Sequence, residues 1–103
     1  MAYEVEWAQS AVASLVEAIE YIARDSPSYA AALALRVDRA ALSLRELPDR
    51  GRRVPEFDDP AVRELIVGSY RMIYRVSPSR VLLLAFVHKA RDLGSLIVGG
   101  SEQ

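Results

Sequence analysis

The chain has 103 residues, of which 51% are hydrophobic, and it contains no cysteine. This length allows one domain with a hydrophobic core of its own, and the absence of cysteine excludes disulfides and thiolate metal sites. Thirteen Lys and Arg against 14 Asp and Glu give a formal net charge of −1, so any nucleic-acid-binding role would depend on a local basic patch. No apolar run approaches the roughly 20 residues that span a bilayer, and residues 1–10 lack a signal-peptide pattern. We therefore expect a cytoplasmic protein without membrane contact.

The N-terminal part predicts a short strand followed by a helix. Residues 3–7 alternate apolar and acidic side chains, which is typical of a strand with one face on a core. From Ser10 the spacing of apolar residues changes to three and four, which predicts a helix ending near residues 24–25. Because Ala8 is a poor N-cap, the start is placed between Ala8 and Ser10. The apolar stripe of this helix comprises Val12, Leu15, Ile19 and Ile22.

A second helix is predicted to begin at Ser26-Pro27, because serine caps free amide groups and proline is tolerated at the first helical position. Pro48 follows its last turn. The joint between the two helices is so short that they must fold back as an antiparallel hairpin. The inner face of the second helix comprises Leu33, Val37, Ala40, Leu44 and Leu47.

Residues 47–60 predict a surface loop, because prolines, Gly51 and several aspartates interrupt the periodic pattern. Three arginines lie in this loop close to Glu56, and we expect these mixed charges to be largely solvated. The arginines are Arg50, Arg52 and Arg53.

Three consecutive antiparallel strands are predicted at residues 62–67, 70–76 and 81–87. Gly68-Ser69 is a two-residue connection typical of a tight hairpin, and Pro78 ends the middle strand because proline has no amide hydrogen for the ladder. The last strand is apolar on both faces, which favours a central or doubly covered position. In the middle strand the better core face comprises Tyr70, Met72, Tyr74 and Val76, and the opposite face comprises Arg71, Ile73 and Arg75.

The predicted fold class is α+β: an N-terminal strand, an antiparallel helix hairpin and a three-stranded antiparallel sheet, in the order β-α-α-β-β-β. The pattern does not fix where the first strand enters the sheet. Residues 1–98 are expected to form a single domain. Within it, residues 93–98 either add a short strand or dock on the body, and residues 99–103 form a flexible tail.

Basic residues gather in the last third of the chain, where six of them face only one acid, Glu64. They are Arg63, Arg71, Arg75, Arg80, Lys89 and Arg91. The single histidine offers no cluster of metal ligands, and glycine-rich phosphate loops are absent, so no metal or cofactor is expected.

If the last two strands pair about Pro78, His88 comes close to Arg71 and Arg91. Two guanidiniums and an imidazole could then stabilise a phosphorane and move a proton in RNA cleavage. Arginines on a solvated face and a histidine bonded to a backbone carbonyl fit the pattern equally well.

Five segments resemble the RelE/ParE superfamily of type II toxins, over residues 3–93. They are Tyr3 to Trp7 leading into a helix that ends Tyr21-Ile22-Ala23, then Arg63-Glu64-Leu65, Gly68-Ser69-Tyr70-Arg71, Ile73-Tyr74-Arg75 and Val87-His88-x-x-Arg91. The resemblance implies a growth-inhibiting toxin that a cognate antitoxin neutralises in a hetero-oligomer. RelE-like members cut messenger RNA on the ribosome, whereas ParE-like members poison DNA gyrase.

The ParE-like branch is the better match. Arg71 and Arg91 match two arginines of the RelE-like pattern, but residues 92–103 lack the aromatic residue that the nuclease branch usually carries. Leu65 stands where that branch commonly has a basic residue. We therefore predict a gyrase inhibitor rather than an enzyme. The alternatives are a metal-independent ribonuclease acting through Arg71, His88 and Arg91, and a relic that only binds its partner.

The resemblance also supplies expectations for individual residues. The predicted target-binding surface comprises Arg63, Arg71, Arg75, Lys89 and Arg91. Arg71 and Arg91 lie outside the apolar stripes, so we expect both to be partly exposed and to matter more for toxicity than for folding. A small sheet with apolar residues on both faces of residues 81–87 also predicts a patch that another chain covers.

Overall fold

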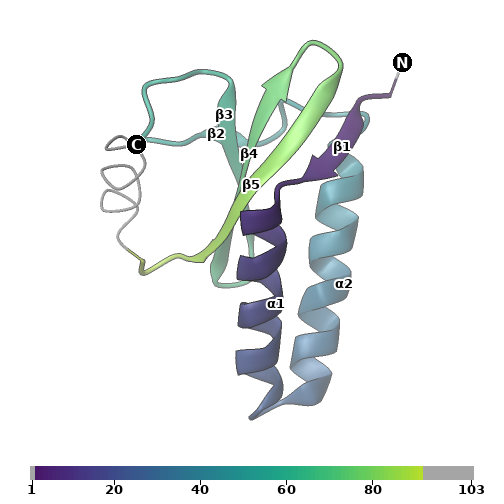
Figure 1. Ribbon diagram of the computed structural model, residues 1–103, viewed down its shortest axis with the longest axis vertical. Helices are drawn as coiled ribbons and strands as arrows, with labels where there is room; N and C mark the ends of the chain where they lie inside the picture. Colours follow the sequence, from purple (N-terminus) through teal and green to yellow (C-terminus); the bar gives the residue numbers. More distant parts are fainter. Residues whose placement is uncertain (1, 92–103) are drawn as a thin grey trace.

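The computed structural model describes residues 2–91 of the chain. Within them a helix hairpin lies beside a twisted sheet (Figure 1). The elements are β1 (Glu4–Trp7), α1 (Gln9–Ala23), α2 (Pro27–Ser43), β2 (Arg52–Arg53), β3 (Val62–Val67), β4 (Tyr70–Ser77) and β5 (Arg80–His88). The α+β class, the helix hairpin and the three consecutive strands are confirmed. The predictions for residues 92–103 fall outside the described residues.

The sheet is mixed rather than wholly antiparallel, and its strand order is β1-β5-β4-β3-β2. The first strand, β1, pairs in parallel with β5, with Glu4 opposite Arg80 and Trp7 opposite Leu83. A parallel pair needs a long crossover, which the helix hairpin and strands β2 to β4 provide here. The insertion of β1 places β5 between β1 and β4. This central position explains why β5 is apolar on both faces, as its sequence predicts.

The segment before β3 is not the solvated loop that its composition predicts. Its Arg52 and Arg53 form β2, which pairs with Glu64 and Arg63 of β3 and covers that edge of the sheet. Val54 then turns inward and is 1% exposed. It packs with residues on the sheet face that the helices leave open, namely Val62, Ile73 and Val87.

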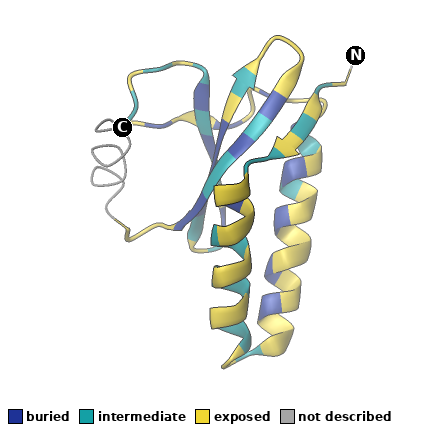
Figure 2. Cartoon of the chain, in the orientation of Figure 1, coloured by how far each residue is buried: buried dark blue, intermediate teal, exposed yellow. Residues whose placement is uncertain are grey.

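The main core lies between the helices and the sheet. On α2 the buried residues keep to one side, and the outward side is exposed (Figure 2). The strands contribute Val67, Met72, Tyr74, Val81, Leu83 and Phe86, and the helices contribute Ala11, Leu33, Val37, Ala41 and Leu44. The predicted core face of the middle strand is thus confirmed. A register shift between Ile73 and Tyr74 of β4 explains why Leu83 and Phe86, three residues apart, face the same side.

Two predicted core positions are wrong. Val12 is 45% exposed while its neighbour Ala11 is fully buried. The amide of Ala8 donates to the carbonyl of Leu83 at 2.9 Å, and this bond sets the rotation of α1 so that Ala11 faces the sheet. Leu47 is 61% exposed because α2 ends at Ser43 and tight turns follow. The predicted cap is present, since Ser26 Oγ accepts a hydrogen bond from the Tyr29 amide.

Neither helix of the described part is long and apolar enough to cross a bilayer.

Tyr74 joins the core to the loop before β2. Its buried hydroxyl donates to the carbonyl of Pro48 at 2.8 Å and accepts from the amide of Gly51 at 2.9 Å. A Cβ on Gly51 would lie 2.5 Å from that hydroxyl, so this position has no room for a side chain. Burial raises the pKa of Tyr74, which keeps the hydroxyl protonated and able to donate.

We expect Tyr74→Phe to lower the free energy of unfolding by about 1–3 kcal/mol, because it leaves two buried backbone groups without a partner. Tyr21→Phe is the matched control, since Tyr21 is 65% exposed and its change should stay within about 0.5 kcal/mol. Urea unfolding of both variants measures the difference. Equal midpoints would show that the hydroxyl does not hold the loop.

Candidate functional site

The residues predicted to form one cationic cluster lie on two faces of the sheet. On β4 and β5, Tyr70 is opposite His88 and Arg71 is opposite Val87. Neighbouring side chains alternate along a strand, so Arg71 points away from the helices while His88 points to the helix side with Tyr70. The expected proximity of Arg71 and His88 is therefore wrong. Of the predicted trio, only His88 and Arg91 line the same groove.

Arg71 is built into a buried ionic network. It is only 7% exposed, and it donates from Nε to Glu64 at 2.6 Å and from both terminal nitrogens to Glu56 at 2.9 and 3.0 Å. Glu64, 1% exposed, also accepts from Nε of Arg52 at 2.5 Å. The expectation of a partly exposed Arg71 is wrong, because two carboxylates hold its guanidinium against the sheet. Glu64, an acid within a strand whose residues other than Arg63 are apolar, is the sequence signal for this network.

The network also moves the pKa values of its members. Hydrogen bonds to Glu56 raise the pKa of Arg71, and the same contact lowers the pKa of the Glu56 carboxyl below its ordinary value. Both groups are therefore charged at neutral pH. The ion pair ties the loop after β2 to β4.

Two further members of the predicted target-binding surface form internal contacts. Arg63 donates to the carbonyl of Gly51 at 2.8 Å and lies 3.5 Å from the Asp49 carboxylate. Arg75 donates to Asp59 at 2.7 Å. The pKa of Asp59 is lowered, first by the amide of Ala61 and then by Arg75.

Lys89 and Arg91 differ from these arginines. Both are exposed, and within residues 2–91 no carboxylate lies within 4 Å of either cationic group. They follow the end of β5, where the amide of Lys89 still donates to the carbonyl of Ser69. Among residues 2–91, Lys89 and Arg91 are thus the members of the predicted surface that form no ion pair, whereas Arg63, Arg71 and Arg75 each have an acidic partner.

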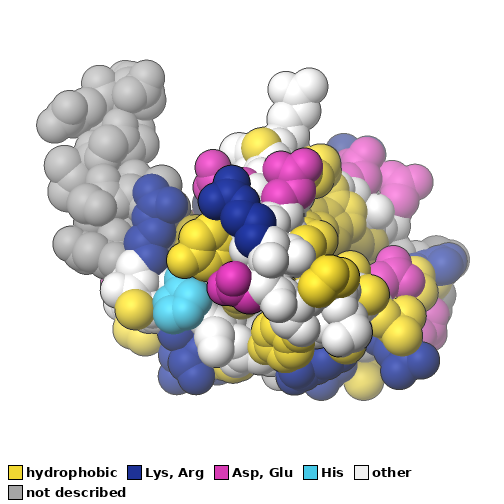
Figure 3. Space-filling model, turned by 90° about the horizontal axis from the view of Figure 1, so that it is seen from below, with side chains coloured by type: hydrophobic (Ala, Val, Ile, Leu, Met, Phe, Trp, Pro, Cys, Tyr) yellow, Lys and Arg dark blue, Asp and Glu magenta, His cyan; other side chains and the backbone are white. Residues whose placement is uncertain are grey.

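A groove with a volume of about 580 Å³ lies between α1 and the ends of β4 and β5. We call it the α1–β5 groove. Its strand side holds Tyr70, Phe86, Val87, His88 and Arg91, and its helix side holds Ser14, Glu17, Ala18, Glu20, Tyr21 and Arg24. Seen from below, the histidine lies at the surface with basic side chains on either side and an acidic one beside it (Figure 3).

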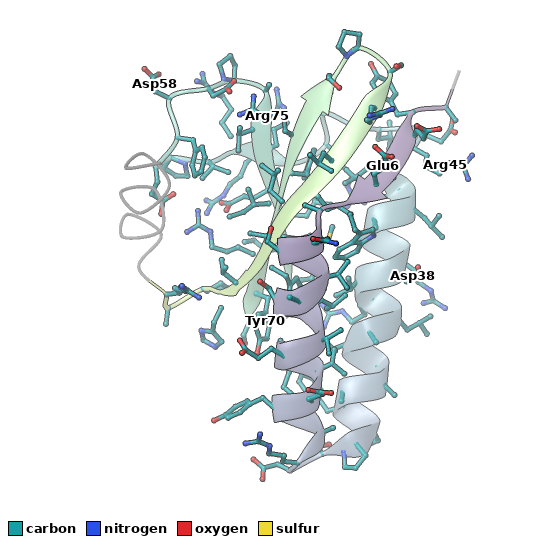
Figure 4. The ribbon with its side chains drawn as sticks, in the orientation of Figure 1. Glu6, Asp38, Arg45, Asp58, Tyr70 and Arg75 are labelled. Atoms are coloured by element: carbon teal, nitrogen blue, oxygen red, sulfur yellow. The ribbon has the colours of Figure 1, made fainter. Side chains whose placement is uncertain are left out.

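The aromatic part of the groove is ordered by stacking. The rings of Tyr70 and Phe86 are 4.7 Å apart and nearly parallel, and the His88 ring meets Tyr70 edge-on at 5.3 Å. Tyr70 lies behind α1 near the start of β4 (Figure 4), and burial raises the pKa of its hydroxyl. The sequence analysis did not predict Tyr21 and Arg24 as part of a site. The spacing of Glu17, Tyr21 and Arg24 nevertheless places them on one face of the helix.

Within the described residues no three His, Asp or Glu side chains are close enough together to hold a metal ion. The groove can therefore offer charge, aromatic surface and one imidazole for chemistry. The opposite face of the sheet offers Lys89 beside the closed network of Arg71, Arg52 and Glu56, which line a second, shallower groove.

We expect Arg71→Ala to destabilise the fold by about 3–5 kcal/mol, because it removes the main partner of a buried carboxylate. The matched control is Arg75→Ala, whose side chain is 46% exposed and whose ion pair should contribute no more than about 1 kcal/mol. Chemical denaturation of the two variants compares them. Similar losses would mean that the network does not stabilise the fold.

Comparisons with known proteins agree with this architecture. The family model described as the ParE toxin of type II toxin–antitoxin systems matches residues 5–93. A Caulobacter vibrioides protein named Toxin RelE2 is 37% identical over 89 residues, which cover 85% of this chain and 97% of the relative.

Two solved structures share the fold. The chromosomal ParDE toxin–antitoxin system of P. aeruginosa superposes with a TM-score of 0.69 at 18% identity, covering 84% of this chain and 95% of that one. The toxin–antitoxin complex RelBE2 of Mycobacterium tuberculosis gives a TM-score of 0.59 at 23% identity, covering 88% and 95%. The family match over most of the chain and the identity to the Caulobacter toxin establish the relationship. The chain belongs to the ParE toxin family of type II toxin–antitoxin systems, within the RelE/ParE superfamily.

Proposed function

We propose that this toxin inhibits growth by poisoning DNA gyrase through protein–protein contact. The state of Arg71 is the observation that supports this proposal. A ribonuclease acting through Arg71, His88 and Arg91 would need all three around one phosphate. Three nitrogens of Arg71 are bonded to carboxylates, and its side chain lies on the opposite face from His88.

Freeing Arg71 for catalysis would be costly. Its withdrawal would leave Glu64 with one remaining partner in a site that is 1% exposed, a penalty on the order of 3–5 kcal/mol. Lys89 and Arg91 need no such rearrangement to meet a target. We propose that gyrase contacts the chain around the end of β5, where Lys89 and Arg91 line grooves on the two sides of the strand, and that the toxin acts in the cytoplasm, where gyrase lies.

A ribosome-dependent ribonuclease is the second candidate. It is supported by the placement of His88 and Arg91 in one groove, since an imidazole and a guanidinium could transfer a proton and stabilise a phosphorane. In this version messenger RNA on the ribosome is the target, and Arg71 has a structural role only.

The two candidates predict different results in parallel assays. We expect the purified toxin to inhibit gyrase supercoiling and to trap cleaved DNA while in vitro translation continues. Lys89→Ala and Arg91→Ala should weaken gyrase inhibition about tenfold or more, the effect of losing a charged contact. Arg45→Ala is the control, because Arg45 lies beside β1 at the far end of the hairpin (Figure 4).

Translation arrest with unaffected gyrase would contradict the proposal and favour the ribonuclease. His88→Ala refines the result, since a nuclease that moves a proton needs the imidazole and a binding surface tolerates its loss. A toxin that reduces neither activity and leaves viable counts unchanged on induction would be the inactive relic.

We also propose that a cognate antitoxin covers the outer side of the helix hairpin. Four large apolar side chains of α1 and α2 are 45–52% exposed: Val12, Val16, Leu35 and Leu42. Isolated apolar residues on a surface are ordinary, but four on one pair of helices favour an apolar partner helix or strand. The two solved relatives come from toxin–antitoxin systems, which supports an antitoxin as that partner.

We expect the toxin to co-purify with the product of the adjacent gene as a hetero-oligomer. The double variant Leu35→Asp/Leu42→Asp should weaken that complex at least about tenfold by burying charge at the contact. Ile66→Asp is the matched control, since Ile66 is 46% exposed but lies on β3. Co-purification and analytical ultracentrifugation measure the complex. A soluble monomer indifferent to the neighbouring product would contradict the assignment.

A further inference from the structure

The α1–β5 groove contains Arg91, one of the two proposed gyrase-binding cations, together with groups that the proposed gyrase contact does not use. It combines aromatic rings, two arginines from opposite walls, a histidine and two carboxylates in about 580 Å³. That volume lies within the range of small-molecule sites and is too small for a folded partner. This composition suits a compact ligand that offers matching groups.

The aromatic groups provide a surface for a flat ring. Phe86 covers one face of Tyr70 at 4.7 Å, and the His88 ring braces Tyr70 edge-on, so the position of Tyr70 is fixed. Tyr21 on the helix wall is 65% exposed, and the Arg24 guanidinium carbon lies 5.8 Å from its ring centre. Exposed aromatic rings beside arginine are the groups on which nucleobases stack.

The charged groups lie in two sets. Arg24 caps the end of α1 and Arg91 follows β5, and both line the groove with His88. One guanidinium can donate two parallel hydrogen bonds to two oxygens of a phosphate. Glu17 and Glu20 lie on the helix wall and can only accept hydrogen bonds when ionised, so they suit a ligand with N–H groups.

We propose that the α1–β5 groove binds a nucleotide. Its base lies against Tyr21 and Tyr70, its phosphate contacts Arg24 and Arg91, and its base edge donates to Glu17 or Glu20. Guanine suits the carboxylates best, because it presents adjacent ring and amino N–H donors to the two oxygens of one carboxylate. A bare anion would leave the acids and rings unused, and a cationic ligand would face two arginines. This site shares Arg91 with the proposed gyrase contact, whereas Tyr21, Tyr70 and Arg24 belong to the nucleotide site alone.

Isothermal titration of the full-length toxin tests the assignment with guanosine monophosphate, guanosine, uridine monophosphate and inorganic phosphate. We expect guanosine monophosphate to bind most tightly. Tyr21→Ala and Arg24→Gln should each raise its Kd about tenfold, as expected for a lost stacking or charge-assisted contact. Both side chains are exposed, so circular dichroism should show folded variants, and Arg45→Gln should bind as the parent does.

A short single-stranded RNA with a terminal guanosine separates the two sources of this ligand. Binding tighter than that of the free nucleotide assigns the groove to a strand end, and equal binding assigns it to a free nucleotide. The proposal is overturned if guanosine monophosphate binds no better than phosphate, or if the Tyr21 and Arg24 variants bind it as tightly as Arg45→Gln. Neither variant changes Lys89 or Arg91. A failure of the nucleotide proposal can therefore be told apart from a failure of the gyrase proposal.

Discussion

A buried carboxylate, Glu64, is the constraint on which the far side of the sheet depends. An ionised group that is 1% exposed is stable only when its oxygens are fully paired. Arg71 and Arg52 supply those partners from β4 and β2. Arg71 also binds Glu56 and so holds the loop after β2, and Val54 of this segment packs with Ile73. A segment rich in proline and charge thereby becomes part of the core.

This network also decides which cations are open to other molecules. Arg71, Arg63 and Arg75 form contacts with groups of their own chain, so much of the basic character of the last third of the sequence is used internally. Lys89 and Arg91 lie beyond the end of β5, where no carboxylate of residues 2–91 is within 4 Å of either cationic group. Charge counted along the sequence therefore overstates the charge available for recognition.

The register shift in β4 and β5 links the core to the α1–β5 groove. Without it, strict alternation would place Phe86 on the opposite face from Leu83. With the shift, the Phe86 ring stacks on the Tyr70 ring, and His88 lies on the helix side of the sheet next to α1. An irregularity in the middle of the sheet thus positions the groups at its end, which is a recognised use of such bulges.

The sequence by itself determined the element order, the α+β class, the core face of β4 and the family, because periodicity, proline positions and short connections act locally. Only the tertiary structure decided how β1 enters the sheet, since parallel pairing joins residues far apart in the chain. It also decided the state of Arg71. Counting residues from the β4–β5 turn brings Arg71 near His88, but side-chain alternation places them on opposite faces. Of the two acids that bind Arg71, Glu64 lies on β3, and Glu56 lies on a loop whose path no local pattern reveals. Burial of Ala11 rather than Val12 has the same origin, because the rotation of a helix is set by what it packs against.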